Sequence, residues 1–314
     1  MSLEADTSPL TAPGVSVDAE ALLRLRHLVR NAPERRLATS GRPGGYAMRR
    51  RGRGLEAIDV RTYSDGDDMR HLDRNTTART GVPHVRTFRD ERERTALLIA
   101  DFRPSMLWGT RRALRSVVAA EALAAVGWRV IEAGGRVGAI AFTAAIPPLF
   151  VPARGRERGM ASVVGGLAAA HRAALGHTAA SVSSEAAEEP PLERVFEMAA
   201  TLMLNGGSVF LASALDRPGD AFDRAAGALH RRAKLTVLLV QDAFELRPPL
   251  GLYHYKTGTG RITQGHVAAS TRRRTPDGRV TRLRRLGVEV VPIDAGEDHN
   301  GMIRQLKGPR DGHC

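Results

Sequence analysis

The segment Thr95-Ala-Leu-Leu-Ile-Ala-Asp101 decides the fold. Five consecutive apolar residues, Ala96 to Ala100, stand between a β-branched threonine and a single carboxylate. A short, continuous apolar run of this kind is typical of a strand buried on both faces, as in a parallel sheet covered by helices. We therefore predict a buried strand over residues 95–100, with Asp101 at its carboxyl end.

Strands and helices alternate from this segment to the C-terminus. Strands are predicted over residues 95–100, 136–142, 208–212, 234–240 and 288–293, and helices over residues 113–133, 160–174, 192–204 and 220–232, with a short terminal helix. Because helical connections must cross back over a sheet, the pattern favours a doubly wound α/β fold with a mostly parallel sheet. Ligands of such sheets lie at the carboxyl ends of the strands, so Asp101 is the first candidate for a site.

The first part of the chain is organised differently. Residues 1–15 are rich in proline, serine and threonine without periodicity, which predicts a disordered tail. A helix capped by Ser16 follows and ends near Asn31, and the glycine- and arginine-rich residues after it predict a loop, short strands and turns. We divide the remainder into residues 16–94, a helix plus a β-rich subdomain, and residues 95–314, the α/β domain.

The composition limits the function classes. The formal charge is +13, but only three of the 47 basic residues are lysines. A GC-rich genome favours arginine over lysine in all its proteins, so the excess of arginine is weak evidence for a function. Aromatic residues make up 4% of the chain, which leaves few surfaces on which bases could stack. Nucleic-acid binding therefore rests on charge alone, and we do not expect it.

Cysteine and hydropathy indicate a cytoplasmic protein. The single cysteine, Cys314, excludes an intrachain disulfide and a cysteine-based metal cage. The longest apolar segment, residues 113–133, is interrupted by Arg115, Glu121 and Arg129, so we expect no membrane span. The N-terminus also lacks the pattern of a secretory signal.

A dense pattern of glycine, arginine and acidic residues precedes the first buried strand. Its marks are Arg51, Gly52, Gly54, Tyr63, Gly66, Asp67, Asp68, Arg70, Asp73 and Arg79. The pattern resembles the domain of unknown function 58 family, whose members carry Gly-Arg-Gly, Tyr-x-x-Gly-Asp-Asp-x-Arg, Ile-Asp-Trp and Ala-Arg blocks before a von Willebrand factor A-like domain. The chain departs from that signature at Arg74, where the family has tryptophan. The resemblance implies a von Willebrand factor A-like, doubly wound fold for residues 95–314.

This resemblance also implies a position for a metal-ion-dependent adhesion site. Many A-domains bind a divalent cation through Asp-x-Ser-x-Ser after the first strand, with a threonine and an aspartate from later loops. Here the motif reads Asp101-Phe-Arg103-Pro-Ser105, and the later positions read Glu-Pro-Pro-Leu and Leu-Ala-Ser-Ala. We predict a degenerate site in which Arg103 pairs with Asp101. A Mg²⁺ site on Asp101 and Ser105, with Asp216 as a substitute ligand, is the alternative.

The acidic residues of the upstream pattern allow two interpretations. Asp67, Asp68 and Asp73 could form a polar face for a partner, or a carboxylate cluster for acid–base work or metal binding. Beside Arg70 and Arg79 they could instead form a hydrogen-bonded lock that holds the β-rich subdomain on the α/β domain, which is the interpretation we favour. The histidines lack metal-ligand spacing, and no nucleotide-binding loop or hydrolase elbow is present.

Three function classes remain. The resemblance implies a non-enzymatic adaptor or chaperone-like protein, because family members commonly accompany MoxR-type AAA+ ATPases. Many relatives carry membrane helices, and since none is expected here, we predict a soluble adaptor, without a cofactor. The first alternative is a divalent-metal-binding protein or metal-dependent enzyme that uses Asp101 with Asp67, Asp68 and Asp73. The second alternative is a nucleic-acid-binding protein.

Overall fold

The computed structural model describes residues 10, 12–31, 57–64, 67, 69–88, 95–144, 147–180, 189–203, 207–256, 262–268 and 277–306. Its contacts divide the chain into two compact units. Residues 1–40 and 95–314 form one unit, here called the body, and residues 41–94 form the other, here called the inserted unit.

The body contains a six-stranded sheet. Its strands are β3 (Thr95–Asp101), β4 (Arg136–Phe142), β5 (Leu149–Gly155), β6 (Ser208–Ser213), β7 (Lys234–Gln241) and β10 (Glu289–Asp294). They lie in the order β10-β7-β6-β3-β4-β5, and all neighbours are parallel except the edge pair β4 and β5. The predicted α/β fold with a mostly parallel sheet is confirmed. Counted from β5, the order is that of a doubly wound sheet, with the switch point between β3 and β6.

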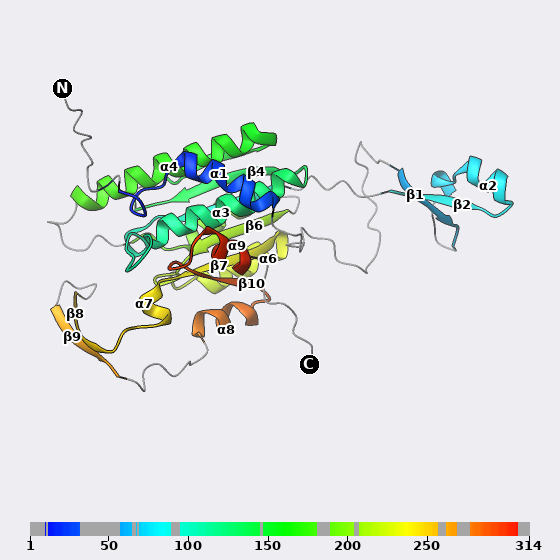
Figure 1. Cartoon of the computed structure of the whole chain (residues 1–314). Coiled ribbons are helices and arrows are strands. Elements are labelled where there is room, and N and C mark those ends of the chain that lie inside the picture. Colours follow the sequence, from blue (N-terminus) through cyan, green and yellow to red (C-terminus); the bar gives the residue numbers. More distant parts are fainter. Residues whose placement is uncertain are drawn as a thin grey trace, which may run out of the picture. The chain divides into compact units, whose positions relative to one another are not determined.

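Helices cover both faces of this sheet (Figure 1). One face packs on α1 (Ala19–Arg30), α3 (Arg115–Glu132), α4 (Arg156–Ala180) and α9 (His299–Gln305), and the other on α5 (Glu193–Leu202), α6 (Phe222–Arg232) and α8 (Gly278–Arg285). The side chains of β3 alternate between the two cores, since Leu98 joins the first while Leu97 and Ile99 join the second. Burial on both faces explains the uninterrupted apolar run of this strand.

Helix α1 belongs to the body. Its cap is Asp18, whose side chain accepts a hydrogen bond from the Glu20 amide, so Ser16 does not have the predicted capping role. Leu22 lies buried against the sheet-covering helices, and its carbonyl accepts a 3.1 Å hydrogen bond from Trp128 Nε1 of α3. The predicted division had instead assigned this helix to the β-rich subdomain.

The residues just before α1 also pack on the body. The Leu114 amide donates a 2.8 Å hydrogen bond to the Gly14 carbonyl. Gly14 has φ of +79°, and a Cβ there would lie 2.3 Å from the Arg112 carbonyl oxygen. The predicted disordered tail therefore does not extend over residues 12–15, and its residues 1–9 and 11 lie outside the described residues. Apolar periodicity cannot reveal such a contact, because it depends on backbone atoms.

Two short elements follow β7. Helix α7 (Ala243–Leu246) begins after Asp242, and strands β8 (Gly251–Lys256) and β9 (Ile262–Val267) form a separate antiparallel hairpin. No helix among the described residues is long and apolar enough to span a lipid bilayer.

The inserted unit is small. Strands β1 (Ala57–Thr62) and β2 (His84–Phe88) pair antiparallel. The 3-10 helix η2 (Met69–His71) and helix α2 (Arg74–Thr80) lie between them in the sequence. The prediction of short strands and turns is confirmed for these residues, but α2 was not predicted. Gly81 ends α2 in the left-handed conformation, with φ of +71°.

Candidate functional site

The candidate site lies at the switch point of the sheet, where β3 ends at Asp101 and β6 ends at Ser213. The connections that leave β3 and β6 run to opposite faces of the sheet, and their divergence creates the position where doubly wound proteins bind ligands. The chain turns after Asp101 through the 3-10 helix η3 (Pro104–Met106), which brings Arg103 back over the strand end.

Asp101 and Arg103 form a fully buried ion pair, and both residues have 0% exposure. Arg103 donates from Nε to Asp101 Oδ1 and from Nη2 to Asp101 Oδ2, each at 2.9 Å. The Arg103 amide donates to Oδ1 at 3.2 Å, and the Ser213 hydroxyl donates to Oδ2 at 2.7 Å. The predicted pairing of Arg103 with Asp101 is confirmed, in the bidentate geometry that arginine favours with carboxylates.

The remaining amino group of Arg103 binds the surrounding loops. Its Nη1 donates to the carbonyl oxygens of Pro190, at 2.9 Å, and Arg217, at 2.8 Å. Glu189 Oε2 lies 3.8 Å away, and Glu189 Oε1 accepts a hydrogen bond from the Ser105 amide. Burial lowers the pKa of Arg103, but the charge and hydrogen bonds of Asp101 outweigh it and raise the pKa, so the guanidinium stays charged.

A second buried arginine extends the site outward. Arg115, at the start of α3, is 1% exposed and binds Asp216 and, at 2.8 Å, Glu245 of α7. It also donates to the Ser105 carbonyl. Its guanidinium lies 4.4 Å from the centre of the Trp108 ring, which is 37% exposed. Arg115 thus joins the loops after β3, β6 and β7.

A third arginine, from α8, completes the arrangement. Arg279 binds Glu245 at 3.1 Å and Asp277 at 2.8 Å, and it donates to the Ala214 carbonyl at 2.7 Å. Its Nη1 lies 3.5 Å from Asp216. Three arginines therefore alternate with carboxylates across this end of the sheet, and we call the set the carboxyl-end network. Its members are Asp101, Arg103, Arg115, Glu189, Asp216, Glu245, Asp277 and Arg279.

The network does not fit a divalent metal ion. The two oxygens of Asp101 already accept four hydrogen bonds, which is the number of lone-pair positions of a carboxylate. Asp216, the substitute ligand considered from the sequence, is held by Arg115 and Arg279. Within the described ranges, no group of three or more His, Cys, Asp or Glu side chains is placed to hold a metal. A cation would have to displace a charged guanidinium from a buried position.

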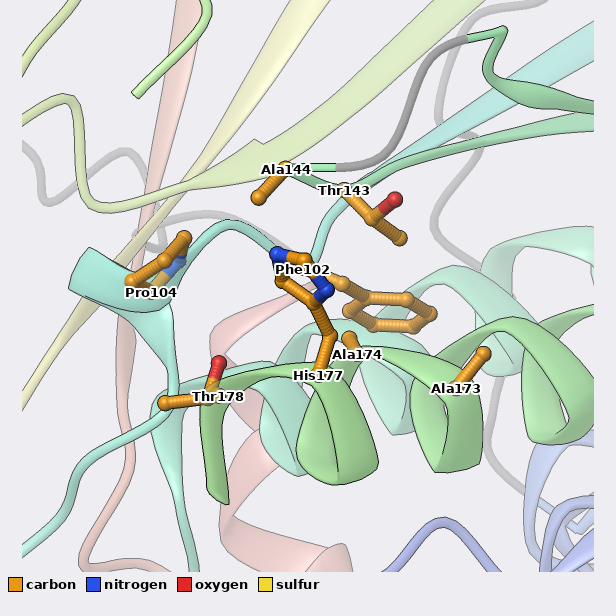
Figure 2. Close-up of a pocket in the computed structure, with 8 residues that line it drawn as sticks. All are labelled: Phe102, Pro104, Thr143, Ala144, Ala173, Ala174, His177 and Thr178. Atoms are coloured by element: carbon orange, nitrogen blue, oxygen red, sulfur yellow. The ribbon is translucent and has the colours of Figure 1, made fainter. Parts of the chain in front are cut away.

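A small hollow lies beside the network. Figure 2 shows the side chains that line it, which come from the loop after β3, the loop after β4 and the last turns of α4. They include Phe102, Pro104, Thr143 and His177. Its volume is about 30 Å³, which is space for about one water molecule. This hollow is too small for an organic substrate.

Two of the predicted acidic residues of the inserted unit, Asp67 and Asp73, have partners inside that unit. Asp67 accepts hydrogen bonds from Arg61 at 2.8 and 2.6 Å and from the Ser64 amide at 2.9 Å. The hydrogen bonds from Arg61 lower the pKa of Asp67. Asp73 caps α2 by accepting from the Thr76 amide. These contacts stabilise the turn and the helix locally, and the lock between the β-rich subdomain and the α/β domain stays a prediction.

Of the other residues of the glycine, arginine and acidic pattern, some are described by the structure and five are not. Arg70 and Arg79 lie at exposed positions of η2 and α2, and the Tyr63 amide donates to the Pro83 carbonyl at 2.8 Å. Five residues of the pattern lie outside the described residues: Arg51, Gly52, Gly54, Gly66 and Asp68. The proposed carboxylate cluster of the inserted unit is therefore described only for Asp67 and Asp73.

Sequence reasoning missed the outer half of the network. Arg115 was considered only as an interruption of an apolar segment, and no role in a site was predicted for Arg279. Except for Asp277, which is two positions from Arg279, their carboxylate partners lie about 30 to 130 positions away in the sequence. A signal was available for Glu245, because Asp242 and Glu245 have the spacing of a capping box, which the structure contains at α7.

These features define an α/β protein with a doubly wound, mostly parallel sheet whose carboxyl end is closed by ion-paired arginines. The chain belongs to the family described as "Protein of unknown function DUF58", whose model matches residues 59–275, more than half of the chain. It is also similar to Uncharacterized protein Mb1516 of Mycobacterium bovis and Uncharacterized protein Rv1480 of Mycobacterium tuberculosis, at 37% identity over 89 residues. The match covers 28% of this chain and 28% of each relative's length.

Proposed function

We propose that this protein is a non-enzymatic adaptor that binds a MoxR-type AAA+ ATPase through a von Willebrand factor A-like body with a degenerate metal-ion-dependent adhesion site. The observation that carries the proposal is the buried Asp101–Arg103 pair at the switch point. A site that holds its own cation in the form of a guanidinium has no open coordination position for a substrate or a metal-bound water.

The outer surface of the network supports a docking role. Trp108 is 37% exposed, and the side chains of Asp216 and Glu245 are 35% and 24% exposed. An exposed tryptophan beside partly exposed charges is typical of protein interfaces, where tryptophan and arginine contribute much of the binding energy. The rigid ion pairs beneath it would present this surface in a fixed shape.

Affinity purification of the tagged full-length chain from its own cells tests the proposal. We expect an AAA+ ATPase to co-purify, and the purified ATPase to bind in a titration that follows tryptophan fluorescence. The chain has two tryptophans, so the Trp128→Phe variant leaves Trp108 as the reporter of the network surface. Recovery of nucleic acid with no ATPase would refute the proposal. An unchanged Trp108 signal on ATPase binding would place the interface elsewhere and remove the network from it.

The Arg172→Ser variant is the matched control for changes in the network. Arg172 lies at an exposed position of α4, so its loss should leave ATPase binding unchanged. Arg279→Ser removes a partly exposed member of the network. If the network shapes the docking surface, we expect this variant to weaken binding about tenfold, the size typical of a residue that contributes to an interface.

A further inference from the structure

On one face of the hairpin of β8 and β9, every side chain whose burial the structure describes is exposed. Leu252 pairs across the hairpin with His266, and His254 pairs with Gln264. These four side chains and Ile262 lie on the same face, because directly opposite residues and alternate residues of a strand share a face. All five are exposed, with Leu252 at 58% and Ile262 at 72%. Two large apolar residues thus stand in water at opposite ends of one face.

The opposite face of the hairpin holds it to the body. Tyr253 points to that side, and its ring packs edge-on against Phe244 of α7 with ring centres 5.0 Å apart. Its hydroxyl donates a 3.0 Å hydrogen bond to the Pro249 carbonyl. Since α7 also carries Glu245 of the carboxyl-end network, the hairpin is attached next to the candidate site. The exposed face is therefore a surface of an anchored element.

Within the described part of the chain, no further strand pairs with the outer edges of the hairpin. Among the described strands, β8 pairs only with β9, and the two form a sheet separate from that of the body (Figure 1). Each strand consequently turns one row of backbone amide and carbonyl groups away from its partner. Such edges accept an additional strand from another chain, a mode of recognition in which the backbone gives affinity and alternate side chains give specificity.

The basic residues in and around the hairpin indicate that its partner is acidic. Arg247, just before the hairpin, pairs with Asp294 at 2.6 Å. From Pro248 to Arg274 the sequence contains five further lysine or arginine residues and no aspartate or glutamate. This segment contains the whole hairpin. A partner that complements it carries acidic side chains together with apolar ones that cover Leu252 and Ile262.

We propose that the β8–β9 hairpin is a docking arm that binds an extended acidic and apolar segment of a protein partner as a third strand. The inference deepens the proposed function, on which it rests only for the identity of that partner as the ATPase or a protein bound to it. A protein segment fits better than a nucleic acid, because Leu252, Ile262 and the strand edges call for apolar side chains and a peptide backbone.

The test uses the full-length protein and fluorescein-labelled probe peptides. The main probe alternates valine and glutamate over the length of one strand. Two further probes alternate valine with lysine, or carry N-methyl groups on alternate amides of the valine–glutamate sequence. A single-stranded oligothymidylate is the nucleic-acid probe. Fluorescence anisotropy measures binding, and hydrogen–deuterium exchange of residues 251–256 and 262–267 reports strand pairing.

We expect the valine–glutamate peptide to bind, the lysine and N-methylated peptides to bind at least about tenfold more weakly, and hairpin amides to exchange more slowly in the complex. The double variant Leu252→Ser, Ile262→Ser should weaken binding about tenfold or more. The matched control, Leu23→Ser with Leu202→Ser, removes two exposed leucines from helices of the body and should bind normally.

Several results would overturn the inference. These are no binding of the acidic peptide at about 1 mM, equal binding of the lysine or N-methylated peptide, equal losses in both double variants, or preference for the oligothymidylate. The outcomes also separate the two proposals. If the ATPase binds the hairpin variant as well as the wild type, the docking arm is wrong while the adaptor function stands. If the acidic peptide binds but no ATPase does, the adaptor function fails and the arm stands.

Discussion

Replacing Arg103 by methionine should strongly destabilise the body. Arg103→Met keeps most of the volume of the side-chain stem but removes the guanidinium, which leaves Asp101 buried without its counter-charge. The Pro190 and Arg217 carbonyls lose a donor as well. Breaking a buried ion pair by removing one partner costs about 3–5 kcal/mol. For a domain of this size that corresponds to a fall in melting temperature of roughly 6–20 °C.

Chemical denaturation followed by circular dichroism measures the effect. The control is Arg172→Met at an exposed position of α4, which should change the free energy of unfolding by less than about 0.5 kcal/mol. Asp101→Asn and the double variant complete a cycle. We expect the double variant to lose less than the sum of the single variants, because no full charge then stays buried without a partner.

One outcome would refute this reasoning. If Arg103→Met unfolds within about 1 kcal/mol of the wild type, the guanidinium does not compensate the buried charge of Asp101. The switch point would then tolerate an open carboxylate, and a metal-binding role for this end of the sheet would regain support.

Four further predictions concern the body. Burial lowers the pKa of His171 to about 4 from 6.5, so the unfolded state binds more protons between these values; stability should fall by about 3 kcal/mol from pH 6.5 to pH 4, and His171→Leu should lose this dependence in urea titrations. Burial raises the pKa of Glu121, but hydrogen bonds from His299 and Arg112 outweigh it and lower the pKa below 4.5. Its stabilising contribution is therefore present above pH 4.5 and lost as the pH falls through the lower folded-state value, and Glu121→Gln should flatten that part of the acid-unfolding curve. Gly14→Ala should cost about 1–3 kcal/mol in thermal unfolding, because the backbone has φ of +79° and a Cβ would collide with a carbonyl oxygen. Magnesium chloride should leave the unfolding midpoint unchanged and give no binding heat in calorimetry, because the carboxylate at the end of β3 is already saturated with hydrogen bonds.

Each of these has a contradicting result. An unchanged pH profile in His171→Leu or Glu121→Gln would mean that the group is not the one that titrates. A Gly14→Ala variant as stable as the wild type would show that the segment before α1 is not packed as described. Micromolar binding of Mg²⁺ that Asp101→Ala abolishes would reverse the conclusion about the metal site.

The central part of the fold could be predicted because its signals are local. The run of five apolar residues at Ala96–Ala100 and the alternation of strands with helices depend on burial and periodicity, and the strands lie within a residue or two of the predicted positions. The Asp101–Arg103 ion pair could also be predicted from the sequence, because the two residues are only two positions apart. Strand β5 escaped prediction, since an antiparallel edge strand with a proline lacks the continuous apolar run.

The remainder depended on contacts between distant residues. Packing of Leu22 and the Trp128–Leu22 hydrogen bond hold α1 on α3. Neither contact can be predicted from the sequence of one helix alone. In the same way, Arg115 meets Asp216 and Glu245 only after three loops converge. A charged residue in an apolar helix can be an interruption or a buried partner, and sequence reasoning could not decide between these.

The attachment of α1 to the body has a practical meaning for anyone who wants to produce a shortened form of this protein. The family match begins at residue 59, so a fragment cut at that boundary would lack the helix that covers part of α3 and α4. Such a fragment would expose the apolar surface that Leu22 and Leu25 cover in the whole chain. The indole N–H of Trp128 would also lose its hydrogen-bond acceptor, the Leu22 carbonyl. Poor yield or aggregation of that fragment would then result from the loss of α1, and would not indicate that the native protein is unstable.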